Sequence, residues 1–468
     1  MNFTLNGREL SEALTGLQRA MASKTKLAVL KHARFHCEGQ TVTASVTDLD
    51  HHAEYKFTDA EVHRPGTLLL PVKNLFRLVK SAKNDQVTLE STDNTQTARI
   101  GLSGALGERT HFLPCMDAEE WPDAPERISV CPADDRFITA YRNLIPFAST
   151  DPTRTVLNGV ALQLGRGGHT LTATDGRRLC TLSDFEFPED VEGILPIHNL
   201  LTWNRFPTSC KLGTRQDQYR VEAGNWTLQG KLVDGTFPNW KQVIPDAHTD
   251  DCVFQLGDGD LPAVKQAVQT LPASHAESGG DKNAGICLMK QDGVVVLSAC
   301  DARGNWVNQP LRHSTLSGSE LTAFNRSYFL QAVEAGFRRW QFADHMAPLR
   351  AETENGIHVL MPLRQENVPG AVKPSTPEET PTQPVTQEEQ PMPKETKPPL
   401  TVMTANEDKP EEDLMTMVQN ARESCRTLNT ALKDIAVKIR ADQRANKALH
   451  NELGNARSVL EKLRDIAA

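Results

Sequence analysis

Three stretches of the sequence decide the fold: Thr41-Val-Thr-Ala-Ser-Val-Thr-Asp48, His169-Thr-Leu-Thr-Ala-Thr-Asp175 and Val294-Val-Val-Leu-Ser-Ala-Cys-Asp301. Each is typical of a strand that ends in a turn. The three aspartates are 127 and 126 residues apart, and two other sets of anchors keep almost the same step: Pro71, Pro196 and Ala323, and Pro114, Pro238 and Pro362. Solenoid repeats are only about 20 to 50 residues long, whereas this period suits a small domain. We therefore predict one fold used three times over residues 1–364.

Composition narrows the class of protein. A chain of 468 residues leaves room for about three domains. No apolar run reaches the roughly 20 residues that a membrane helix needs, and the first residues lack the apolar core of a signal peptide. The nine cysteines are scattered without a Cys-x-x-Cys pair, which predicts free thiols in a reducing cytoplasm and no zinc site.

The net charge of −9 does not by itself identify a partner, because a basic stripe can coexist with an acidic exterior. Each repeat is predicted to hold two helices among short strands. In the first repeat these cover residues 7–23 and 71–83, where apolar residues recur at helical spacing. Lys73, Arg77 and Lys80 fall on the polar face of the second helix, and no acid occurs between Pro71 and Asn84. Equivalent helices are predicted over residues 197–206 and 325–339.

The composition changes after residue 364. Ten prolines among Thr, Glu, Gln and Lys predict a disordered linker over residues 365–410. Residues 411–468 then carry an apolar 4–3 repeat from Leu414 to Ala467, interrupted by Asp442 and Asn446. This spacing predicts a coiled coil. A single amphipathic helix that folds back on the body is the alternative.

Several motifs resemble the bacterial DNA polymerase III beta sliding clamp family. Residues 149–160, 171–179 (Leu-Thr-Ala-Thr-Asp-Gly-Arg-Arg-Leu) and 232–245 (Leu-Val-Asp-Gly-Thr-Phe-Pro-Asn-Trp-Lys-Gln-Val-Ile-Pro) are similar to its middle domain. Residues 359–364 (Val-Leu-Met-Pro-Leu-Arg) resemble its C-terminus, and residues 47–50 and 112–122 also fit. The resemblance covers residues 1–364 and leaves the tail outside.

The resemblance implies an α+β fold, with three tandem copies of the processivity-fold domain at 1–125, 126–248 and 249–364. It further implies that two chains close head to tail into a homodimer ring, with helices lining the hole and antiparallel sheets outside. Double-stranded DNA would pass through, and the ring would tether DNA polymerase for processive replication. No cofactor is expected, and a separate ATP-driven loader would open the ring.

Basic residues on the lining would attract phosphates without reading sequence. We expect DNA contacts from the acid-free helix and, by the resemblance, from further bases; the candidates are Lys24, Lys73, Arg77, Lys80, Lys83, Arg154, His198, Arg205 and Arg326. The alternative is an ordinary solvated helix face.

The resemblance also implies a pocket in which polymerase and clamp-loader subunits insert short peptides with apolar anchors. Carried over by position, its residues are Leu157, Thr174, Gly176, Arg178, Leu179, Pro238, Val243, Asn325, Tyr328, Met346, Pro348, Val359, Leu360, Met361, Pro362 and Arg364. Taken singly, Leu157, Val243 and Val359 fit core residues better than pocket residues, so the pocket rests on the resemblance.

The sequence departs from the family in places. Arg177, Gln242 and Asn283 replace other residue types around the pocket, which leaves its peptide preference open. The ring-closing stretch at 273–283 is almost without apolar residues, and His111 stands where an aromatic is frequent. Weak ring closure is therefore expected. The coiled coil at 411–467 would then raise the local concentration of a second copy, or recruit a partner.

Other functions remain as alternatives. Asp48, Asp50, His51 and His52 could bind a metal, but a polar turn at a strand end is the preferred explanation, because no second group of ligands has a matching spacing. No Ser/His/Asp or Cys/His set is evident, so we predict a subunit without an active site. The alternatives are an accessory clamp for repair or a mobile element, a coiled-coil scaffold that no longer encircles DNA, and a hydrolase that uses the Asp/His cluster.

Overall fold

The structure is a computed structural model that describes residues 1–22, 24–82, 85–92, 96–105, 107–166, 168–246, 252–272, 284–301, 303, 305–318 and 321–363. The chain divides into two compact units, Met1–Pro377 and Glu378–Ala468, and every described residue belongs to the first. The predicted linker and coiled coil, together with Lys83, Asn283 and Arg364, lie outside the described residues.

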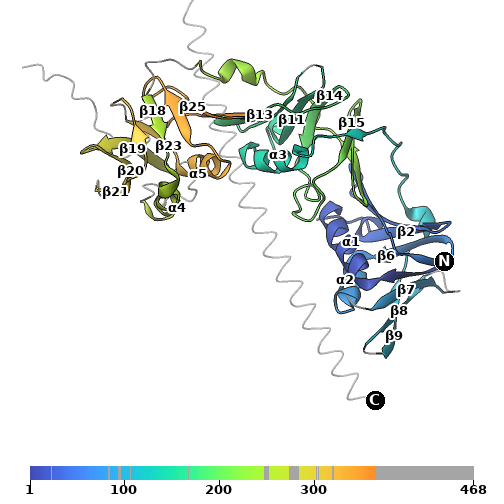
Figure 1. Cartoon of the computed structure of the whole chain (residues 1–468). Helices are drawn as coiled ribbons and strands as arrows, with labels where there is room; N and C mark the ends of the chain where they lie inside the picture. Colours follow the sequence, from blue (N-terminus) through green and yellow to red (C-terminus); the bar gives the residue numbers. More distant parts are fainter. Residues whose placement is uncertain are drawn as a thin grey trace, which may run out of the picture. The chain divides into compact units, whose positions relative to one another are not determined.

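The described residues of the first repeat form nine strands and two α-helices. Figure 1 shows α1 and α2 beside the strands of this repeat. Its strands are β1 (Asn2–Asn6), β2 (His32–Glu38), β3 (Thr41–Thr47), β4 (His51–Lys56), β5 (Glu61–Arg64), β6 (Gly66–Pro71), β7 (Gln86–Ser91), β8 (Thr97–Gly104) and β9 (Gly107–Pro114). Its helices are α1 (Gly7–Ala20) and α2 (Val72–Lys80), with short 3₁₀ turns η1 (Val29–Lys31) and η2 (Ala118–Glu120).

The second repeat follows a similar order. Its strands are β10 (Cys131–Pro132), β11 (Gly159–Leu164), β12 (Thr170–Thr174), β13 (Arg178–Leu182), β14 (Val191–Pro196), β15 (Lys211–Arg215), β16 (Gln218–Ala223) and β17 (Trp226–Lys231). The described residues form one α-helix here, α3 (Phe137–Leu144), and the 3₁₀ turns η3 (Ile145–Phe147), η4 (Thr155–Leu157) and η5 (Trp240–Val243).

The third repeat again places two helices among strands. Its strands are β18 (Cys252–Gln255), β19 (Gly285–Gln291), β20 (Val294–Cys300), β21 (Trp306–Leu311), β22 (Thr315–Leu316), β23 (Thr322–Asn325), β24 (Arg339–Phe342), β25 (Leu349–Thr353) and β26 (Gly356–Leu360). The helices are α4 (Leu261–Thr270) and α5 (Arg326–Glu334), with the turn η6 (Asp258–Asp260).

The order of strands within the sheets repeats three times. The runs β6-β2-β3-β4, β14-β11-β12-β13 and β23-β19-β20-β21 are equivalent, and so are the runs β1-β7-β8-β9, β10-β15-β16-β17 and β18-β24-β25-β26. The three-fold repetition predicted from the spacing of the sequence anchors is thus present in the strand connections. All strand pairs among the described residues are antiparallel, as in hairpin-rich α+β folds.

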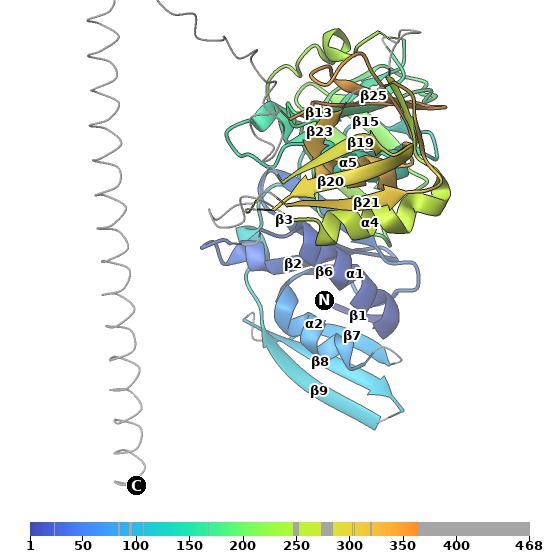
Figure 2. The ribbon, with the colours of Figure 1, turned by 90° about the vertical axis from the view of Figure 1, so that its left-hand side faces the viewer.

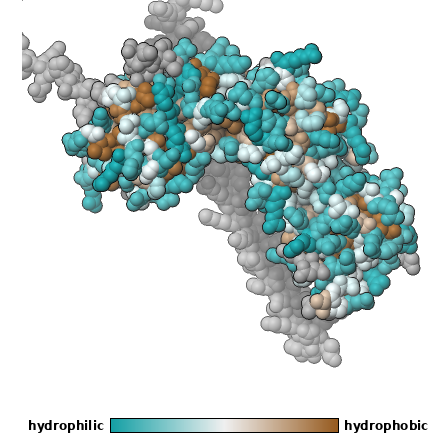
Figure 3. Space-filling model, viewed as in Figure 1, coloured by the Kyte–Doolittle hydropathy of each residue, from teal (hydrophilic) through white to brown (hydrophobic). Residues whose placement is uncertain are grey.

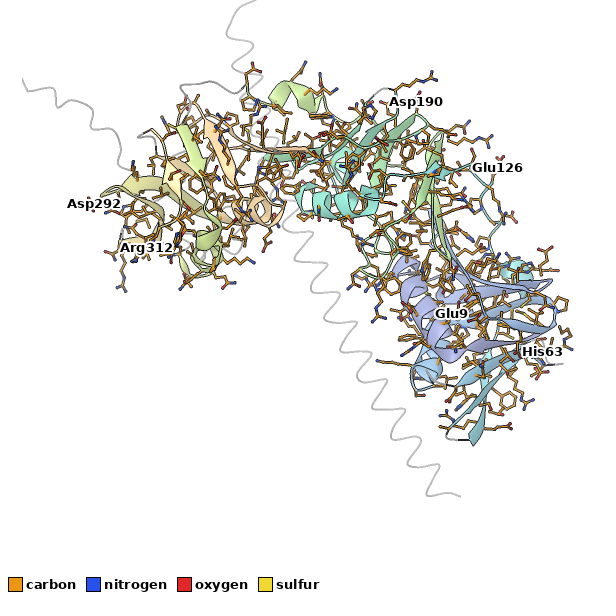
Figure 4. All side chains as sticks on the ribbon, in the orientation of Figure 1. Glu9, His63, Glu126, Asp190, Asp292 and Arg312 are labelled. Atoms are coloured by element: carbon orange, nitrogen blue, oxygen red, sulfur yellow. The ribbon has the colours of Figure 1, made fainter. Side chains whose placement is uncertain are left out.

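Strands from successive repeats join into continuous sheets. Strand β4 pairs with β17, with Tyr55 opposite Trp226, and makes one eight-stranded sheet from the first and second repeats. Strand β13 pairs with β26, with Leu179 opposite Val359, and makes one nine-stranded sheet from the second and third. Glu126, labelled in Figure 4, lies in the segment that connects the first two repeats and accepts a hydrogen bond from Arg215 at 2.9 Å.

Among the edge strands that the structure describes, two stand where the other repeats have a partner strand. Strand β9 ends the five-stranded sheet β5-β1-β7-β8-β9, and β21 ends the four-stranded sheet β21-β20-β19-β23 (Figure 2). They occupy the positions that β17 and β26, or β4 and β13, hold in the other repeats. Each of those other strands has a partner from a neighbouring repeat, so β9 and β21 are the two strands for which the pattern is incomplete.

Local sequence explains the best-formed helices. Asn6 caps α1 by accepting hydrogen bonds from the backbone N–H groups of Arg8 and Glu9. Leu10, Leu14 and Leu17 then fall on one buried face of the helix. In α2 the buried residues are Val72, Leu75 and Val79, at the spacing that the sequence predicts.

The prediction of a helix over residues 197–206 is wrong. This segment forms irregular turns. Its carbonyl groups are engaged from outside, because the Arg142 guanidinium of α3 donates to the carbonyls of Leu201, Trp203 and Phe206 at 2.6–2.9 Å. Carbonyls held in this way are directed toward α3 and not along a helix axis.

The helix predicted over residues 325–339 is shorter than expected. It ends at Glu334, and β24 begins at Arg339. Gly336 has a φ of +100°, and the N–H groups of Gly336 and Phe337 donate to the carbonyls of Val333 and Ala332. This is the usual way in which a glycine ends a helix.

Candidate DNA-binding and peptide-binding surfaces

Helix α2 presents the basic surface that the sequence predicts. Lys73, Arg77 and Lys80 are exposed, while Val72, Leu75 and Val79 anchor the opposite face in the core. Arg77 and Lys80 lie in the last turn of the helix, where positive charge is favoured by the helix dipole. The three cations project from one rigid element and form a stripe without an acidic residue of the same helix.

Three other predicted bases are also exposed: Lys24, Arg154 and Arg205. Arg154 is engaged on one side, since Nη1 donates to the carbonyl of Asp175 at 3.2 Å and Nε lies 3.9 Å from Asp151 Oδ2. Its side chain is still 54% exposed, so a phosphate could reach it. Lys24 follows α1, and Arg205 lies in the turns after β14.

His198 does not fit the predicted role in DNA binding. It is only 6% exposed, and its Nδ1 accepts a hydrogen bond from the N–H of Leu200. Burial lowers its pKa to about 4, with a smaller contribution from His51. The imidazole is therefore neutral near pH 7, and the structure contradicts the expected cationic contact.

Arg326 is likewise an internal residue. It is 5% exposed, and its guanidinium donates to the carbonyls of Leu271 (2.6 Å), Gly285 (3.2 Å) and Pro272. Leu271 caps the C-terminus of α4, where carbonyls lack partners within the helix. Arg326 thus holds the end of α4 and has no free face for DNA, which contradicts the prediction.

Two of the residues predicted for the pocket lie in a small apolar cluster that crosses two repeats. Leu179 of β13, Trp240 of η5 and Val359 of β26 form a buried cluster separate from the main core, with Phe237, Ile244 and Ile357 packed against it. Val243 and Met361 lie beside these residues in the sequence and are 55% and 45% exposed. In Figure 3, apolar residues reach the surface in several places, including the region of β13 and β25.

Arg178, the residue before Leu179 in β13, ties the second repeat to the third. Its guanidinium bonds Asp175 at 3.1 Å, donates to Gln331 of α5 and to the carbonyl of Pro146, and lies 3.9 Å from the ring centroid of Tyr328. Burial is the main influence on its pKa and lowers it. With 5% of its side chain exposed, Arg178 positions Tyr328 and does not itself face a peptide.

The other predicted pocket residues differ in exposure. Gly176, Pro238 and Met346 are exposed, Thr174, Tyr328, Pro348 and Pro362 are half-buried, and Leu157, Asn325 and Leu360 are buried. Asn325 has a clear structural task, since its Oδ1 accepts from the N–H groups of Ser327 and Tyr328 and caps α5. Gly176 has a φ of +81° and lies against Arg154, where a Cβ would be 3.1 Å from Nη1.

Sequence reasoning missed the apolar residues of the open edges. Phe112 on β9 is 62% exposed, and Trp306 and Val307 on β21 are 37% and 43% exposed. The alternation of β9, with Leu113 buried and Phe112 outside, was a signal for the first. For Trp306 and Val307, the signal was that two apolar residues are adjacent at the start of β21. Successive side chains of a strand point to opposite faces, so two adjacent apolar residues put apolar surface on both faces.

The Asp48 cluster has a local structural use. Its Oδ1 accepts from the N–H groups of Asp50 and His51, and the ring of His51 lies 3.2 Å from Oδ2. Burial works to raise the pKa of Asp48, but the hydrogen bonds from His51 outweigh it and lower that pKa. Within the described residues, no three acidic, His or Cys side chains converge as metal ligands, and no described helix is both long and apolar enough to span a membrane.

Comparison with known proteins agrees with this architecture. Residues 1–125 match the family model for the N-terminal domain of the DNA polymerase III beta subunit, and residues 137–239 match the model for its central domain. The first two repeats are therefore similar to two successive domains of the DNA polymerase III beta subunit. The tail from residue 365 lies outside both matches.

Individual family members align over nearly their whole length. The beta sliding clamp of Pseudomonas aeruginosa is 24% identical over 380 residues, which cover 78% of this chain and 100% of the relative. Solved structures of the DNA polymerase III subunit beta from Pseudomonas aeruginosa and of the DNA polymerase sliding clamp from Bacillus subtilis match with TM-scores of 0.66 and 0.67 at 22% and 20% identity. Both matches cover 78% of this chain and at least 99% of the other. The first and the last of these three relatives are named as sliding clamps, in agreement with the predicted function.

Proposed function

We propose that this chain is a sliding clamp whose copies close head to tail around duplex DNA and tether a DNA polymerase. The observation that carries the proposal is the incomplete sheet pattern. Strands β4 and β13 each pair with the last strand of the next repeat, β17 and β26. Only β21 and β9 lack such a partner among the described strands. Pairing β21 of one copy with β9 of the next completes the pattern and closes a ring.

The residues on those edges suit an interface between copies. Phe112, Trp306 and Val307 are apolar and exposed on strands with free backbone hydrogen-bonding groups. Burying such edges removes an aggregation hazard and supplies apolar contact. The expected weak closure rested on residues 273–283, which lie outside the described residues, and on His111, which is half-buried on β9. We infer that the two edge strands contribute more to closure than that stretch suggests.

A closed ring would place the α2 stripe of Lys73, Arg77 and Lys80 toward the DNA. Cations on a rigid surface attract phosphates at any sequence, which allows sliding. Lys24, Arg154 and Arg205 would add to this field, while His198 and Arg326 would not. The predicted coiled coil at 411–467, which would bind a second copy or a partner, remains a prediction outside the described residues, and so does a cytoplasmic location.

The ring is tested by retention on circular DNA. The protein should remain on a nicked circular plasmid during gel filtration and be lost once the plasmid is linearised. The double variant Phe112→Asp, Trp306→Asp should be lost from both, and its mass in solution should fall to that of a single chain. Equal retention on circular and linear DNA would point to the scaffold alternative.

The pocket is tested separately. Met361→Asp changes an exposed residue, so the fold should be kept, whereas Leu179→Asp would place a charge in a buried cluster. Met361→Asp should abolish stimulation of the cognate polymerase in a primer-extension assay while leaving retention on circular DNA intact. Full stimulation by this variant would move the pocket elsewhere.

A further inference from the structure

The junctions on either side of the second repeat are built alike. Strand β4 pairs with β17 at the first junction, as β13 pairs with β26 at the second. In the loops that precede β4 and β13, Asp48 and Asp175 each accept hydrogen bonds from the backbone N–H groups two and three residues later, at 2.7–3.1 Å. Leu49 and Gly176 then have nearly the same φ, +83° and +81°. The predicted peptide pocket at the second junction therefore has a structural counterpart at the first.

A cavity of about 120 Å³ lies at this first junction. Its lining comes from the loop before β4, from the end of β17 and from the segment that connects the first two repeats. The lining residues that matter below are Leu49, Asp50, Pro122, Asp123, Pro125 and Lys231. Pockets for whole small molecules measure about 300–1,000 Å³, so this cavity has room for a single side chain of a partner protein.

The two junctions differ in the residues that face each other across the strand pairing. Leu179 lies opposite Val359 at the second junction, whereas His52 lies opposite Gln229 at the first. Burial lowers the pKa of His52 to about 4, so its imidazole is neutral near pH 7. Gln229 is 1% exposed, and its amide donates to the carbonyl of Glu126 (Figure 4) at 2.5 Å. An apolar anchor therefore suits the second junction, and a polar anchor suits the first.

The charges of the cavity favour a cationic anchor. Apart from the histidines, the ionisable side chains of its described lining are Asp50, Asp123 and Lys231. Lys231 Nζ lies 3.4 Å from Asp50 Oδ1, and the two side chains are 58% and 68% exposed. Asp123 is also exposed, so carboxylates outnumber ammonium groups and hold a guanidinium or ammonium group by charge-assisted hydrogen bonds. Pro122 and Pro125 give the same cavity apolar walls, which suit the aliphatic stem of an arginine or lysine.

Leu49 adds an apolar contact beside the charged groups. Its side chain is 57% exposed, and a bulky residue with a φ of +83° is an uncommon one. The N–H of Leu49 donates to Thr47 Oγ1 at 3.0 Å, as the N–H of Gly176 donates to Thr174 Oγ1 at 3.1 Å. The same loop thus presents a leucine side chain at the first junction and none at the second. A leucine next to the cavity suits an apolar residue that neighbours the cationic anchor in the partner.

We propose that the first junction is a second peptide-binding site, which takes an arginine or lysine side chain of a partner protein. Asp50 and Asp123 meet the charge of this anchor, and Leu49 contacts the residue beside it. The proposal rests on the proposed function in one respect, the comparison with the predicted peptide pocket, and it requires no closed ring. A chain with both sites would hold a partner with apolar anchors and a partner with a basic anchor at the same time.

The test uses the full chain and two fluorescein-labelled peptides, Gly-Leu-Arg-Leu-Gly and Gly-Leu-Gln-Leu-Gly, with binding measured by anisotropy. The arginine peptide should bind about tenfold more tightly than the glutamine peptide. The variant Asp50→Asn, Asp123→Asn changes two exposed side chains and should remove this preference. Lys231 is the counterpart of Met361, because each follows the last paired residue of its strand. Lys231→Met removes the competing cation and should tighten binding of the arginine peptide about threefold, a gain that damage to the fold would not produce.

A matched variant controls for the net charge of the protein. Asp59→Asn, Asp292→Asn makes the same charge change at two exposed residues outside the cavity lining and should bind the arginine peptide like the natural sequence. An equal loss of binding in this variant would show that the peptide follows net charge, and it would overturn the proposal. Equal binding of the two peptides, or a Kd weaker than about 1 mM for the arginine peptide, would overturn it as well.

Met361→Asp separates the two junctions. This variant should bind the arginine peptide as tightly as the natural sequence does, because Met361 belongs to the second junction. Loss of that binding would place the peptide in the predicted pocket and would count against a second site. If the arginine peptide fails to bind while Met361→Asp still abolishes polymerase stimulation, the second site fails and the proposed function stands.

Discussion

Helices α2 and α5 occupy equivalent places in the first and third repeats, yet they use their cations in opposite ways. Each follows the strand that ends its four-stranded run, β6 or β23. Helix α2 exposes Lys73, Arg77 and Lys80. Helix α5 begins with the buried Arg326, and its Glu334 lies 3.9 Å from Lys265 of α4. One repeat therefore offers a basic face, while the other uses its charges to join its own two helices.

The largest effect should come from the exposed stripe. Replacing Lys73, Arg77 and Lys80 together by Glu removes three phosphate contacts. At 0.1 M salt this should weaken DNA affinity by at least about 500-fold and reduce the slope of log K against log salt by about 2.7. Affinity measured by anisotropy on a short duplex over a series of salt concentrations checks both values. An unchanged slope would exclude α2 from the DNA-binding surface.

A matched pair of single variants measures the contrast between repeats. Lys73→Glu should weaken DNA affinity about tenfold, whereas Lys265→Glu on the third repeat should change it less than threefold, because Lys265 lies beside Glu334. Equal losses of DNA affinity for the two variants would mean that both repeats attract DNA equally. The contrast between α2 and α5 would then have no functional meaning.

The next effect concerns stability. Arg326→Ala removes a buried guanidinium that donates to at least three carbonyls, so the free energy of unfolding should fall by about 3 kcal/mol. Arg77→Ala on the exposed face should change it by less than about 0.5 kcal/mol. Urea denaturation followed by circular dichroism gives both values. Retained DNA affinity in Arg326→Ala would support its structural role, and a specific loss of affinity without a loss of stability would contradict it.

This contrast also shows what sequence could and could not predict. The anchors near Asp48, Asp175 and Asp301 predicted the repeat, because a strand-turn pattern depends on neighbouring residues. The apolar spacing of Val72, Leu75 and Val79 predicted α2 for the same reason. The fate of Arg326 depends on the carbonyls of Leu271 and Gly285, which lie 55 and 41 residues away in the chain. A local pattern contains no information on that contact.

The second repeat illustrates the same limit. The segment 197–206 has an adequate helical pattern, but Arg142 of a distant helix takes up its carbonyls. Leu179 and Val359, both named for the pocket, lie in one buried apolar cluster, and peptide binding there stays a prediction. The roles of Trp240 in this cluster and of Phe112 on the edge strand β9 were not predicted. The surroundings of these residues are set by strands from other repeats or by an open sheet edge.

His198 follows β14 in the second repeat, as α2 follows β6 and α5 follows β23. This third position allows a pH test of the comparison. Its pKa is about 4 in the folded protein against 6.5 ordinarily, because of burial. A depressed pKa of a histidine means that the unfolded chain binds the proton more tightly, so stability is complete above about pH 6.5 and is lost as the pH falls toward 4. Between pH 7 and 5 the free energy of unfolding should fall by about 2 kcal/mol through this residue.

His198→Asn isolates that contribution. The Asn side chain can accept the hydrogen bond from Leu200 N–H without titrating. Urea midpoints measured at pH 7 and 5 should therefore differ less in the variant than in the natural protein. His52 and His358, whose pKa values are lowered to about 4 and about 3 mainly by burial, will keep part of the acid sensitivity in both. An identical pH dependence would mean that His198 is not buried as a neutral group.

The smallest effect concerns the different ways in which α2 and α5 end. Helix α5 ends before Gly336, with φ +100° and no atom within 4 Å of where a Cβ would lie, whereas α2 ends at Ser81 in an ordinary right-handed conformation. Gly336→Ala should lower the free energy of unfolding by about 1 kcal/mol through backbone strain alone. Gly336→Asn should cost less, because Asn tolerates the left-handed region. There is open space around the new Cβ in both variants, so only the backbone conformation should distinguish them. Equal losses of unfolding free energy for Ala and Asn in denaturant titrations would show that something other than backbone conformation ends α5. The difference between its predicted and observed length would then need another cause.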